Sequence, residues 1–287
     1  MARPRASVLT PDEKHAENSE TVNTRMVYGT GPKATLRGCQ RMDVVAAYAL
    51  AKEVVVQAGY EPEIVWQASV IFDETTETDF LREHAWVTIS AGMHEYVVRR
   101  HFPAISRAFL DWKSADAIVE HEAECRQSAL RYFCNHRKID SIVRMARIVS
   151  SAGIGSFKES NRDNPLETLQ SLPFVGPVTC YHLAKNIGLP FAKPDRHLVR
   201  LARAVGYSDV QGLCKRISEH VGDSVPVVDI VLWRFSLINS AYCDVFSSAA
   251  LSNCRNGARR RQRTVETRAS VAEAKPPRDL NWSIGCV

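Results

Sequence analysis

Apolar residues recur at helical spacing along most of this chain, and no segment alternates apolar and polar residues as a strand does. The runs are short, and turns containing glycine, proline or asparagine separate them. Helices are expected over 42–58, 78–96, 97–112 with a break near Pro103, 115–133, 137–150, from 165 onward, and over 178–187, 197–205, 210–220 and 227–239. No internal repeat is present. The pattern predicts an all-α protein of many short helices.

The composition is that of a folded protein. Of 287 residues, 45% are hydrophobic and 24% are charged, which suits one large or two modest domains and excludes global disorder. No stretch approaches the ~20 apolar residues of a membrane-spanning helix. No apolar run follows the arginines at the start of the chain, as a secretory signal would require. We therefore expect a soluble, cytoplasmic protein without a membrane partner.

The net charge of +5 is concentrated near the C-terminus. Six arginines and one glutamate lie between residues 255 and 268, and this run accounts for the whole excess. Residues 1–35 and 251–287 are polar, so we expect a disordered arm and a basic disordered tail. The tail could add sequence-independent affinity for DNA, or it could serve solubility alone. Because the rest of the chain is neutral, an argument for nucleic-acid binding must come from local chemistry.

The eight cysteines form no metal-binding pattern. There is no CxxC pair, and the spacing around Cys243 and Cys254 is not that of an iron–sulfur loop or a zinc ribbon. Reduced thiols in a cytosolic protein account for them. Neither an iron–sulfur cluster nor a zinc ion is expected.

The most informative segment runs from Leu166 to Gly206. Residues 172–176, Leu-Pro-Phe-Val-Gly, lie between two expected helices, and Thr179 opens the second. Such a turn leaves unpaired backbone N–H groups at a helix start, and together with the helix dipole they can bind one phosphate. The second helix ends at Gly188, and a proline-rich turn then leads to Asp195 at the start of the next helix.

These residues resemble the helix-hairpin-helix DNA glycosylase superfamily, in which a Gly/Pro-rich loop and an aspartate follow the hairpin. Asp195 lies nineteen residues after Gly176, in agreement with that pattern. The stretch from Phe174 to Tyr181 is most similar to the hairpin of the bacterial 3-methyladenine DNA glycosylases. Those enzymes carry a structural zinc whose ligands have no counterpart here, and they lack the aspartate that this chain keeps. The similarity spans roughly residues 80–237 and is specific only from the hairpin to the aspartate.

The resemblance implies two helical lobes with a cleft between them. One lobe would be a helical bundle over residues 78–189 that ends in the helix-hairpin-helix. The other would join residues 36–77 to residues 190–250. Asp195 would then lie at the junction, where the family has its cleft.

The resemblance also implies that Asp195 is catalytic. Cleavage of an N-glycosidic bond builds positive charge on the sugar, and a carboxylate near C1′ can stabilise that charge and activate water. The target base must leave the stack first, because the bond is inaccessible inside a duplex. The alternative is that Asp195 only caps the helix that begins at Arg196 or His197.

Superfamily members that also cut the DNA backbone carry a lysine two residues after the hairpin glycine, where it forms a Schiff base. Val178 occupies that position here, so no lyase activity of that type is expected. Lys193, two residues before Asp195, is interpreted as a phosphate contact or a solvated side chain. A role as a displaced catalytic amine is the less favoured alternative.

The expected DNA contacts come from the hairpin, the loop after it and one basic turn. They are Pro173, Phe174, Val175, Gly176, Pro177, Val178, Thr179, Lys193, His136, Arg137 and Lys138. The turn at residues 136–138 could equally be solvated.

The expected pocket for a flipped base gathers aromatic and polar side chains. Its candidates are Trp86, Met93, His94, Glu95, Tyr181 and His182. Each could instead fill the core or face solvent, and Met93 is also the candidate wedge in the vacated stack. Several family members carry a glutamate four residues before an Ala-Gly pair, where this chain has Val87. Without that acid, the pocket favours bases that leave easily, such as positively charged alkylated purines.

The expected function is that of a monofunctional DNA glycosylase, which hydrolyses the bond to a damaged, alkylated or otherwise modified base in base excision repair. The partner would be double-stranded DNA, and we expect a monomer at a bacterial-type nucleoid. No cofactor is expected, although the hairpin could hold a monovalent cation. One alternative is a non-catalytic helix-hairpin-helix DNA-binding protein. The other is a glycosylase for mismatched, oxidised or virus-modified bases.

Overall fold

A computed structural model describes residues 43–252 of the chain. The arm expected at residues 1–35 and the arginine run at residues 255–268 lie outside the described residues. The last described helix extends to Ser252, so residues 251 and 252 are helical, although we expected the tail to begin at residue 251.

The described residues are helical and contain no strand, which confirms the all-α prediction for this part of the chain. The elements, in chain order, are α1 Asp43–Val55, η1 Val56–Tyr60, α2 Glu61–Ser69, η2 Phe72–Glu74, α3 Glu77–Ser90, α4 Glu95–Ala108, η3 Leu110–Trp112, α5 Ala115–Glu120, α6 Glu122–Tyr132, α7 His136–Ser160, α8 Pro165–Gln170, α9 Thr179–Asn186, α10 Arg196–Ala204, α11 Val210–Val221, α12 Val225–Ile238 and α13 Tyr242–Ser252. Within the described region, none of these helices combines the length and the apolar character needed to cross a bilayer.

Short polar side chains define several helix starts. Thr76 and Asp79 form a reciprocal capping box at the start of α3. Asn135 accepts a hydrogen bond from the backbone of Lys138 at the start of α7, and Asp209 does the same for Gly212 at the start of α11. These local signals explain why most helix positions could be predicted from sequence.

Four helix predictions need correction. The helix predicted over residues 78–96 ends at Ser90, and residues 91–94 form a turn before α4 begins at Glu95. Pro103 lies inside α4, and the helix continues past it to Ala108, so the predicted break is wrong. The segment 115–133 is two helices, because His121 (φ −109°, ψ 28°) leaves helical geometry between α5 and α6. The helix α7, which was predicted to end at residue 150, extends to Ser160 and is kinked at Gly153 (φ 75°, ψ 153°).

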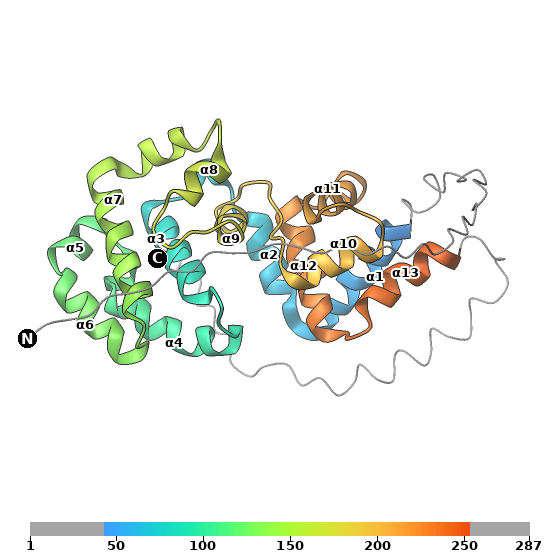
Figure 1. The fold of residues 1–287 in the computed structure, drawn as a ribbon, viewed down its shortest axis with the longest axis horizontal. Coiled ribbons are helices and arrows are strands. Elements are labelled where there is room, and N and C mark those ends of the chain that lie inside the picture. Colours follow the sequence, from blue (N-terminus) through green and yellow to red (C-terminus); the bar gives the residue numbers. More distant parts are fainter. Residues whose placement is uncertain (1–42, 253–287) are drawn as a thin grey trace, which may run out of the picture. The chain divides into compact units, whose positions relative to one another are not determined.

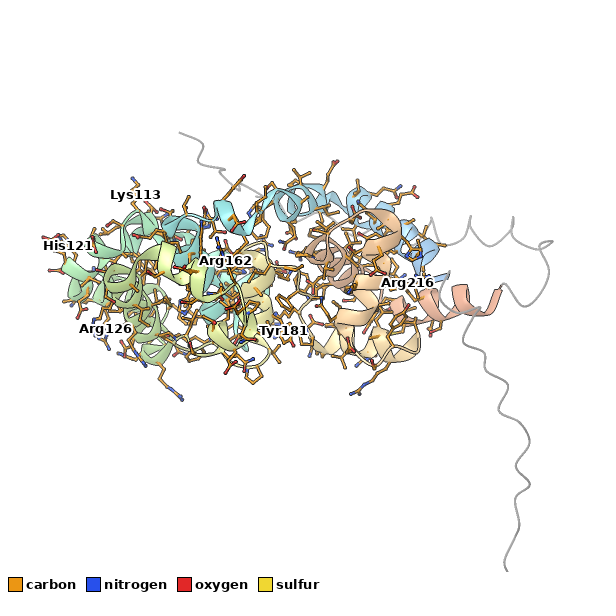
Figure 2. All side chains as sticks on the ribbon, turned by 90° about the horizontal axis from the view of Figure 1, so that it is seen from above. Lys113, His121, Arg126, Arg162, Tyr181 and Arg216 are labelled. Carbon is orange, nitrogen blue, oxygen red and sulfur yellow. The ribbon has the colours of Figure 1, made fainter. Side chains whose placement is uncertain are left out.

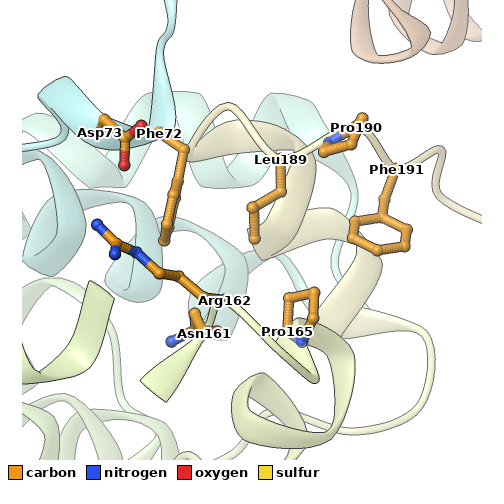
Figure 3. Close-up of a pocket in the computed structure, with 8 residues that line it drawn as sticks. All are labelled: Phe72, Asp73, Asn161, Arg162, Pro165, Leu189, Pro190 and Phe191. Carbon is orange, nitrogen blue, oxygen red and sulfur yellow. The ribbon is translucent and has the colours of Figure 1, made fainter. Parts of the chain in front are cut away.

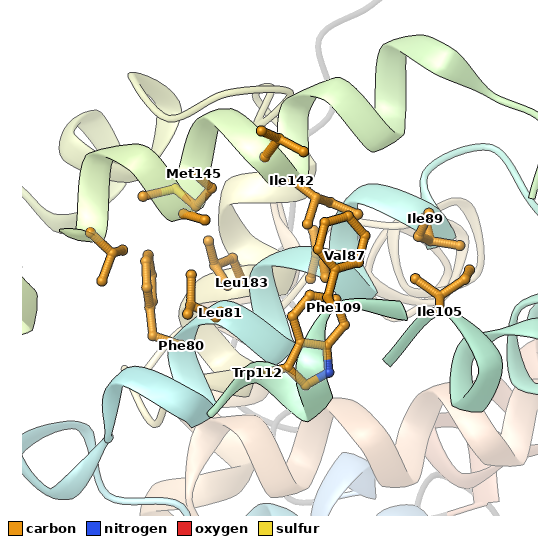
Figure 4. Close-up of a cluster of buried hydrophobic side chains, with 14 of the residues drawn as sticks. Phe80, Leu81, Val87, Ile89, Ile105, Phe109, Trp112, Ile142, Met145 and Leu183 are labelled. Carbon is orange, nitrogen blue, oxygen red and sulfur yellow. The ribbon is translucent and has the colours of Figure 1, made fainter. Parts of the chain in front are cut away.

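The buried apolar side chains form two clusters. The first is built from α3 to α9 with η3, and its largest members include Phe80, Phe109 and Trp112 (Figure 4). The second is built from α1, α2 and α10 to α13, and its largest members include Tyr48 and Phe246. Figure 1 shows the corresponding groups of helices, with α9 of the first group followed by the loop that leads to α10 of the second.

Gly188 closes the turn between α9 and that loop. Its φ is +87°, and a Cβ there would lie 2.6 Å from the Phe72 nitrogen and 2.9 Å from the Val70 oxygen. Side chains reinforce the same junction, since Gln67 donates to the Lys185 carbonyl at 2.8 Å. The end of α9 is therefore fixed against the segment between α2 and α3.

Replacing Gly188 with alanine should destabilise the fold. We expect Gly188→Ala to lower the free energy of unfolding by about 2–4 kcal/mol, because the left-handed backbone and the clash with backbone atoms add together. Gly222→Ala is the matched control, since Gly222 has φ +79° but nothing within 4 Å of a Cβ, and it should cost about 1 kcal/mol. Urea titrations measure both, and equal losses would contradict the close approach at Gly188.

Candidate functional site

The Leu-Pro-Phe-Val-Gly hairpin is a compact turn at the start of α9. The Val175 N–H donates to the Leu172 carbonyl at 3.1 Å, and Phe174 adopts a positive φ of 64°. Val175 is buried, whereas the Phe174 ring is 40% exposed. The Gly176 N–H donates to the Thr179 hydroxyl at 2.5 Å. The turn is thus held by its own hydrogen bonds.

Unpaired donors remain at the first residues of α9. Among the described residues, the N–H groups of Val178 and Thr179 have no acceptor within the chain. Val178 is exposed and Pro177 has no N–H, so these two donors lie at an accessible helix N-terminus. At Gly176 a Cβ would meet only the Thr179 hydroxyl, at 3.7 Å. The chain itself therefore leaves open space beside that glycine.

His84 of α3 supports the hairpin from beneath. It is fully buried, and its Nε2–H donates to the Pro173 carbonyl at 2.9 Å. Burial lowers the pKa of His84 to about 4, although the hydrogen bond to Pro173 acts in the opposite direction. The imidazole is therefore neutral at pH 7, and it ties the hairpin to the first hydrophobic cluster.

The basic turn at residues 136–138 contributes less to a DNA surface than the sequence suggested. Lys138 is buried, and its ammonium group donates to the Ile89 carbonyl at 2.7 Å and to the Ala91 carbonyl at 2.6 Å. The prediction of a phosphate contact for Lys138 is therefore corrected: the residue ties α7 to the end of α3. Burial lowers the pKa of Lys138. His136 and Arg137 are exposed, as a surface contact requires.

One carboxylate joins α9 to the loop that carries Asp195. Asp229 of α12 is buried and pairs through Oδ1 with the Lys185 ammonium of α9 at 2.8 Å. Its other oxygen accepts the Lys193 backbone N–H at 2.7 Å. Gln211 holds the same loop, since its amide oxygen accepts the Ala192 N–H at 2.8 Å. The loop geometry before Asp195 is therefore set by α9, α11 and α12 together.

Asp195 caps α10 with one of its two oxygens. Oδ1 accepts the N–H groups of His197 at 2.9 Å and Leu198 at 3.0 Å. Among the described residues, Oδ2 makes no hydrogen bond, and the half-buried side chain lines a cavity. The helix-cap interpretation is thus correct for Oδ1. Oδ2 takes no part in the cap and is available to a ligand in the cavity.

That cavity has a volume of about 840 Å³, and eight of the eighteen predicted site residues line it. The predicted residues that line it are Trp86, Met93, His94, Glu95, Val178, His182, Lys193 and Asp195. Its walls come from α2, α3, α4, α9 and α12, together with the 91–94 turn and the loop before α10. Val178, at the N-cap of the hairpin helix, and Asp195 therefore line the same cavity.

Tyr181 does not line this cavity. Its ring packs edge-on against Phe191, with the ring centroids 6.0 Å apart. Figure 2 draws the side chains of the described residues and labels Tyr181. Tyr181 faces a different side of α9 from His182, so its prediction as a base-pocket residue is corrected.

Two glutamates and two arginines form a closed network in the cavity wall. Arg234 of α12 binds both oxygens of Glu63, at 2.6 Å and 2.7 Å, and both oxygens of Glu95, at 2.8 Å and 2.5 Å. Arg99 binds Glu63 at 2.8 Å and Glu95 at 2.7 Å. Burial acts to raise the pKa of Glu95, but the hydrogen bonds and charges of the two arginines outweigh it, and that pKa lies below its ordinary value. Glu95 is thus an ionised part of the wall.

Lys193 and His182 face each other inside the cavity, with the ammonium 3.3 Å from His182 Nδ1. Burial lowers the pKa of His182 well below its ordinary value, and the charges of Lys193 and Lys185 lower it further. Burial likewise lowers the pKa of Lys193, although Asp195 opposes that shift. The neutral imidazole therefore accepts a hydrogen bond from Lys193 through Nδ1.

Several residues of the cavity were not predicted from the sequence. The cavity is also lined by Glu63, Glu83, Lys185, Asn186, Asp229 and Arg234. A signal for two of them exists in the sequence, because Asp229 and Arg234 interrupt an otherwise apolar helix, and charges in such positions need buried partners. The identity of those partners depends on residues distant in the sequence, since Glu63 lies 171 positions from Arg234 and Lys185 lies 44 positions from Asp229.

A second, smaller cavity of about 390 Å³ lies beside the turn after α9 (Figure 3). Its lining includes Phe72, Arg162 and Phe191, with Asn161 at its edge. The Asn161 amide oxygen is buried and accepts no hydrogen bond among the described residues. None of the residues predicted for DNA binding or catalysis lines this cavity.

The described residues contain no cluster of three or more side chains suited to a metal ion. Compared with protein-family models and with curated proteins, the chain has no match. The account of its function therefore depends on the site itself.

The neutral state of His84 makes stability sensitive to acid. Between pH 6.5 and pH 4 the unfolded chain takes up a proton on this residue that the folded chain excludes, so acidification should destabilise the fold. The contribution is at most about 3 kcal/mol. His84→Gln keeps an N–H for the Pro173 carbonyl but cannot titrate, so its unfolding free energy should fall less over this range. Urea titrations at several pH values measure the difference, and parallel curves for the two proteins would contradict a neutral His84.

Proposed function

We propose that this protein is a DNA glycosylase that hydrolyses the N-glycosidic bond of a damaged or modified base. The observation that carries the proposal is the shared cavity. It is lined by Val178, at the exposed start of the hairpin helix, and by Asp195, which keeps one carboxylate oxygen without a hydrogen bond among the described residues. A phosphate-binding turn and a free carboxylate oxygen are the two groups that the reaction requires side by side.

In the proposed complex, the free N–H groups of Val178 and Thr179 bind one phosphate oxygen of the DNA backbone. The adjoining sugar then lies toward Asp195, and the base rotates out of the stack into the cavity. A volume of about 840 Å³ is ample for one flipped base. The Asp195 carboxylate stabilises the positive charge on the sugar and accepts a proton from the attacking water.

The two hydrophobic clusters fit the two lobes of a helix-hairpin-helix glycosylase under this proposal. The first covers residues 80–189 and the second combines residues 44–64 with residues 192–246. The partner would be double-stranded DNA bound by a monomer in the cytoplasm. The Phe174 and Val175 carbonyls accept no hydrogen bond among the described residues, so they are the hairpin groups that could bind a monovalent cation. Val178 stands where the lyase lysine would be, and the proposed reaction is therefore hydrolytic.

A second candidate function is non-catalytic DNA binding. It is favoured by one observation, that Asp195 Oδ1 already serves as the cap of α10. In that case the hairpin would bind DNA and the carboxylate would have only a structural role.

Asp195→Asn separates the two functions. The amide oxygen can still accept the two cap N–H groups, so the fold and the DNA affinity should persist. The negative charge is lost, and we expect excision to fall by a factor of about 100 or more. Single-turnover release of bases from lesion-containing duplexes measures the first quantity, and a DNA-binding titration measures the second. Wild-type rates in the variant would leave DNA binding as the function.

Gly176→Ala tests the hairpin contact. A Cβ at this position meets nothing closer than 3.7 Å within the chain, so thermal stability should change little. A phosphate approaching the turn would meet the new methyl group, and we expect DNA affinity to fall by about tenfold. Gly155→Ala is the matched control, because Gly155 is an exposed glycine of α7 with nothing within 4 Å of a Cβ. Unchanged DNA affinity in Gly176→Ala would contradict the proposed contact.

A further inference from the structure

We propose that Glu83 donates the proton to the leaving base, and that the bases removed are therefore ones that are neutral in DNA. The inference rests on the proposed glycosylase function and assigns a second reacting group to the same cavity. It replaces the expectation of a cationic alkylated base. That expectation was based on Val87, which occupies the position where several family members carry a glutamate. Glu83 lies one helical turn before Val87 on α3.

The placement of Glu83 is unusual for a glutamate. It lines the cavity that contains Asp195, yet the residue is only 5% exposed. Asn186 of α9 donates to Glu83 Oε2 at 2.8 Å. Asn186 lines the cavity as well, so a carboxyl group and an amide form a fixed hydrogen-bonding pair at its buried side. Two such groups can recognise an edge of a base and can transfer a proton to it.

Burial makes the protonated form of Glu83 more favourable than it is in an exposed glutamate. Burial raises the pKa of Glu83, and the neighbouring Asp79 charge adds to this, whereas Arg82 and the hydrogen bond from Asn186 lower it. Arg82 Nε lies 3.2 Å from Glu83 Oε1, and Arg82 is itself partly exposed.

The two titratable side chains of α9 that line this cavity, His182 and Lys185, do not form an ion pair with Glu83. The Lys185 ammonium is already paired with Asp229 at 2.8 Å. His182 is held neutral by burial, which lowers its pKa. A carboxyl group whose pKa is raised by burial keeps its proton to higher pH than an exposed glutamate does, and it can act as a general acid.

The aromatic walls point to the same class of substrate. A cationic base is bound best over aromatic faces, through cation–π attraction. Here Arg234 lies over the Trp233 ring at 4.4 Å and Arg99 lies over the Trp86 ring at 5.8 Å. A positively charged base would compete with these guanidinium groups, whereas a neutral base would not.

The proton balance of the step is complete. As the bond between C1′ and the base nitrogen breaks, its electron pair goes to the base and the Glu83 proton is transferred to a ring nitrogen of the base. Water adds to C1′ and gives one proton to the Asp195 carboxylate. The products are the free base and an abasic sugar, and solvent then returns a proton to Glu83 and removes one from Asp195.

The experiment compares excision of neutral and cationic bases by wild type and Glu83→Gln. Duplexes carry hypoxanthine, uracil or 8-oxoguanine as neutral bases, and 7-methylguanine or 3-methyladenine as cationic ones. For the neutral base that wild type excises, we expect Glu83→Gln to lower the single-turnover rate by about 100-fold, with the cationic bases changed by less than about threefold. Glu124→Gln, at an exposed position of α6, is the matched control. Melting temperatures show whether each variant is folded.

A pH profile of the wild-type protein gives a second readout that needs no variant. Because a general acid acts in its protonated form, the rate on a neutral base should fall as the pH rises through the pKa of Glu83, and the rate on a cationic base should not. Excision confined to cationic bases, or equal effects of Glu83→Gln on both classes, would overturn the role of Glu83 and leave the glycosylase proposal intact. Release of no base from any duplex would overturn the glycosylase proposal itself.

Discussion

The buried ion pair between Asp229 and Lys185 is the constraint on which the site depends. One carboxylate oxygen holds the ammonium of the hairpin helix, and the other holds the backbone of Lys193, two residues before Asp195. Both side chains are at most 5% exposed. Removing one partner of such a pair leaves an uncompensated buried charge, which costs about 3–5 kcal/mol. A single carboxylate on a third helix therefore connects the hairpin helix to the loop that carries Asp195.

Other ionisable groups in and near the cavity are also paired or held neutral. Glu63, Glu95, Arg99 and Arg234 neutralise one another in the wall, and His84 stays neutral beneath the hairpin. Charges that would be costly in an enclosed space are thus paired or suppressed by burial. Lys193, which has no carboxylate within ion-pair distance among the described residues, and the second oxygen of Asp195 are the exceptions. An ammonium without an ion-pair partner and a carboxylate oxygen without a hydrogen bond are available to a ligand in the cavity.

The hairpin and the aspartate could be found from the sequence because their signals are local. A glycine-containing turn, a threonine at the helix start and an aspartate after a proline-rich loop act over a few residues, and the structure places each where the pattern predicted. Lys138 and Tyr181 were misplaced for the opposite reason. Both lie on predicted helices, but which side of a helix faces the cavity depends on packing against helices distant in the sequence.

Glu83 was missed by the sequence analysis for the same reason. The predicted helix included Glu83 as well as Val87, but nothing local indicates that a glutamate between Arg82 and His84 lines a cavity rather than facing solvent. The contact that defines its environment comes from Asn186, which lies 103 residues further along the chain. Long-range contacts of this kind decide the chemistry of the pocket, whereas local signals decide where the helices begin and end.

The most direct measurement is the product formed when the wild-type protein meets duplexes that each contain one altered base. The account predicts that at least one duplex loses its base as the free, unbroken molecule, and that its strand stays intact until hot alkali cleaves the abasic position. If every altered base remained attached after prolonged incubation with folded protein that binds the DNA, the joint action of the hairpin and Asp195 would be contradicted.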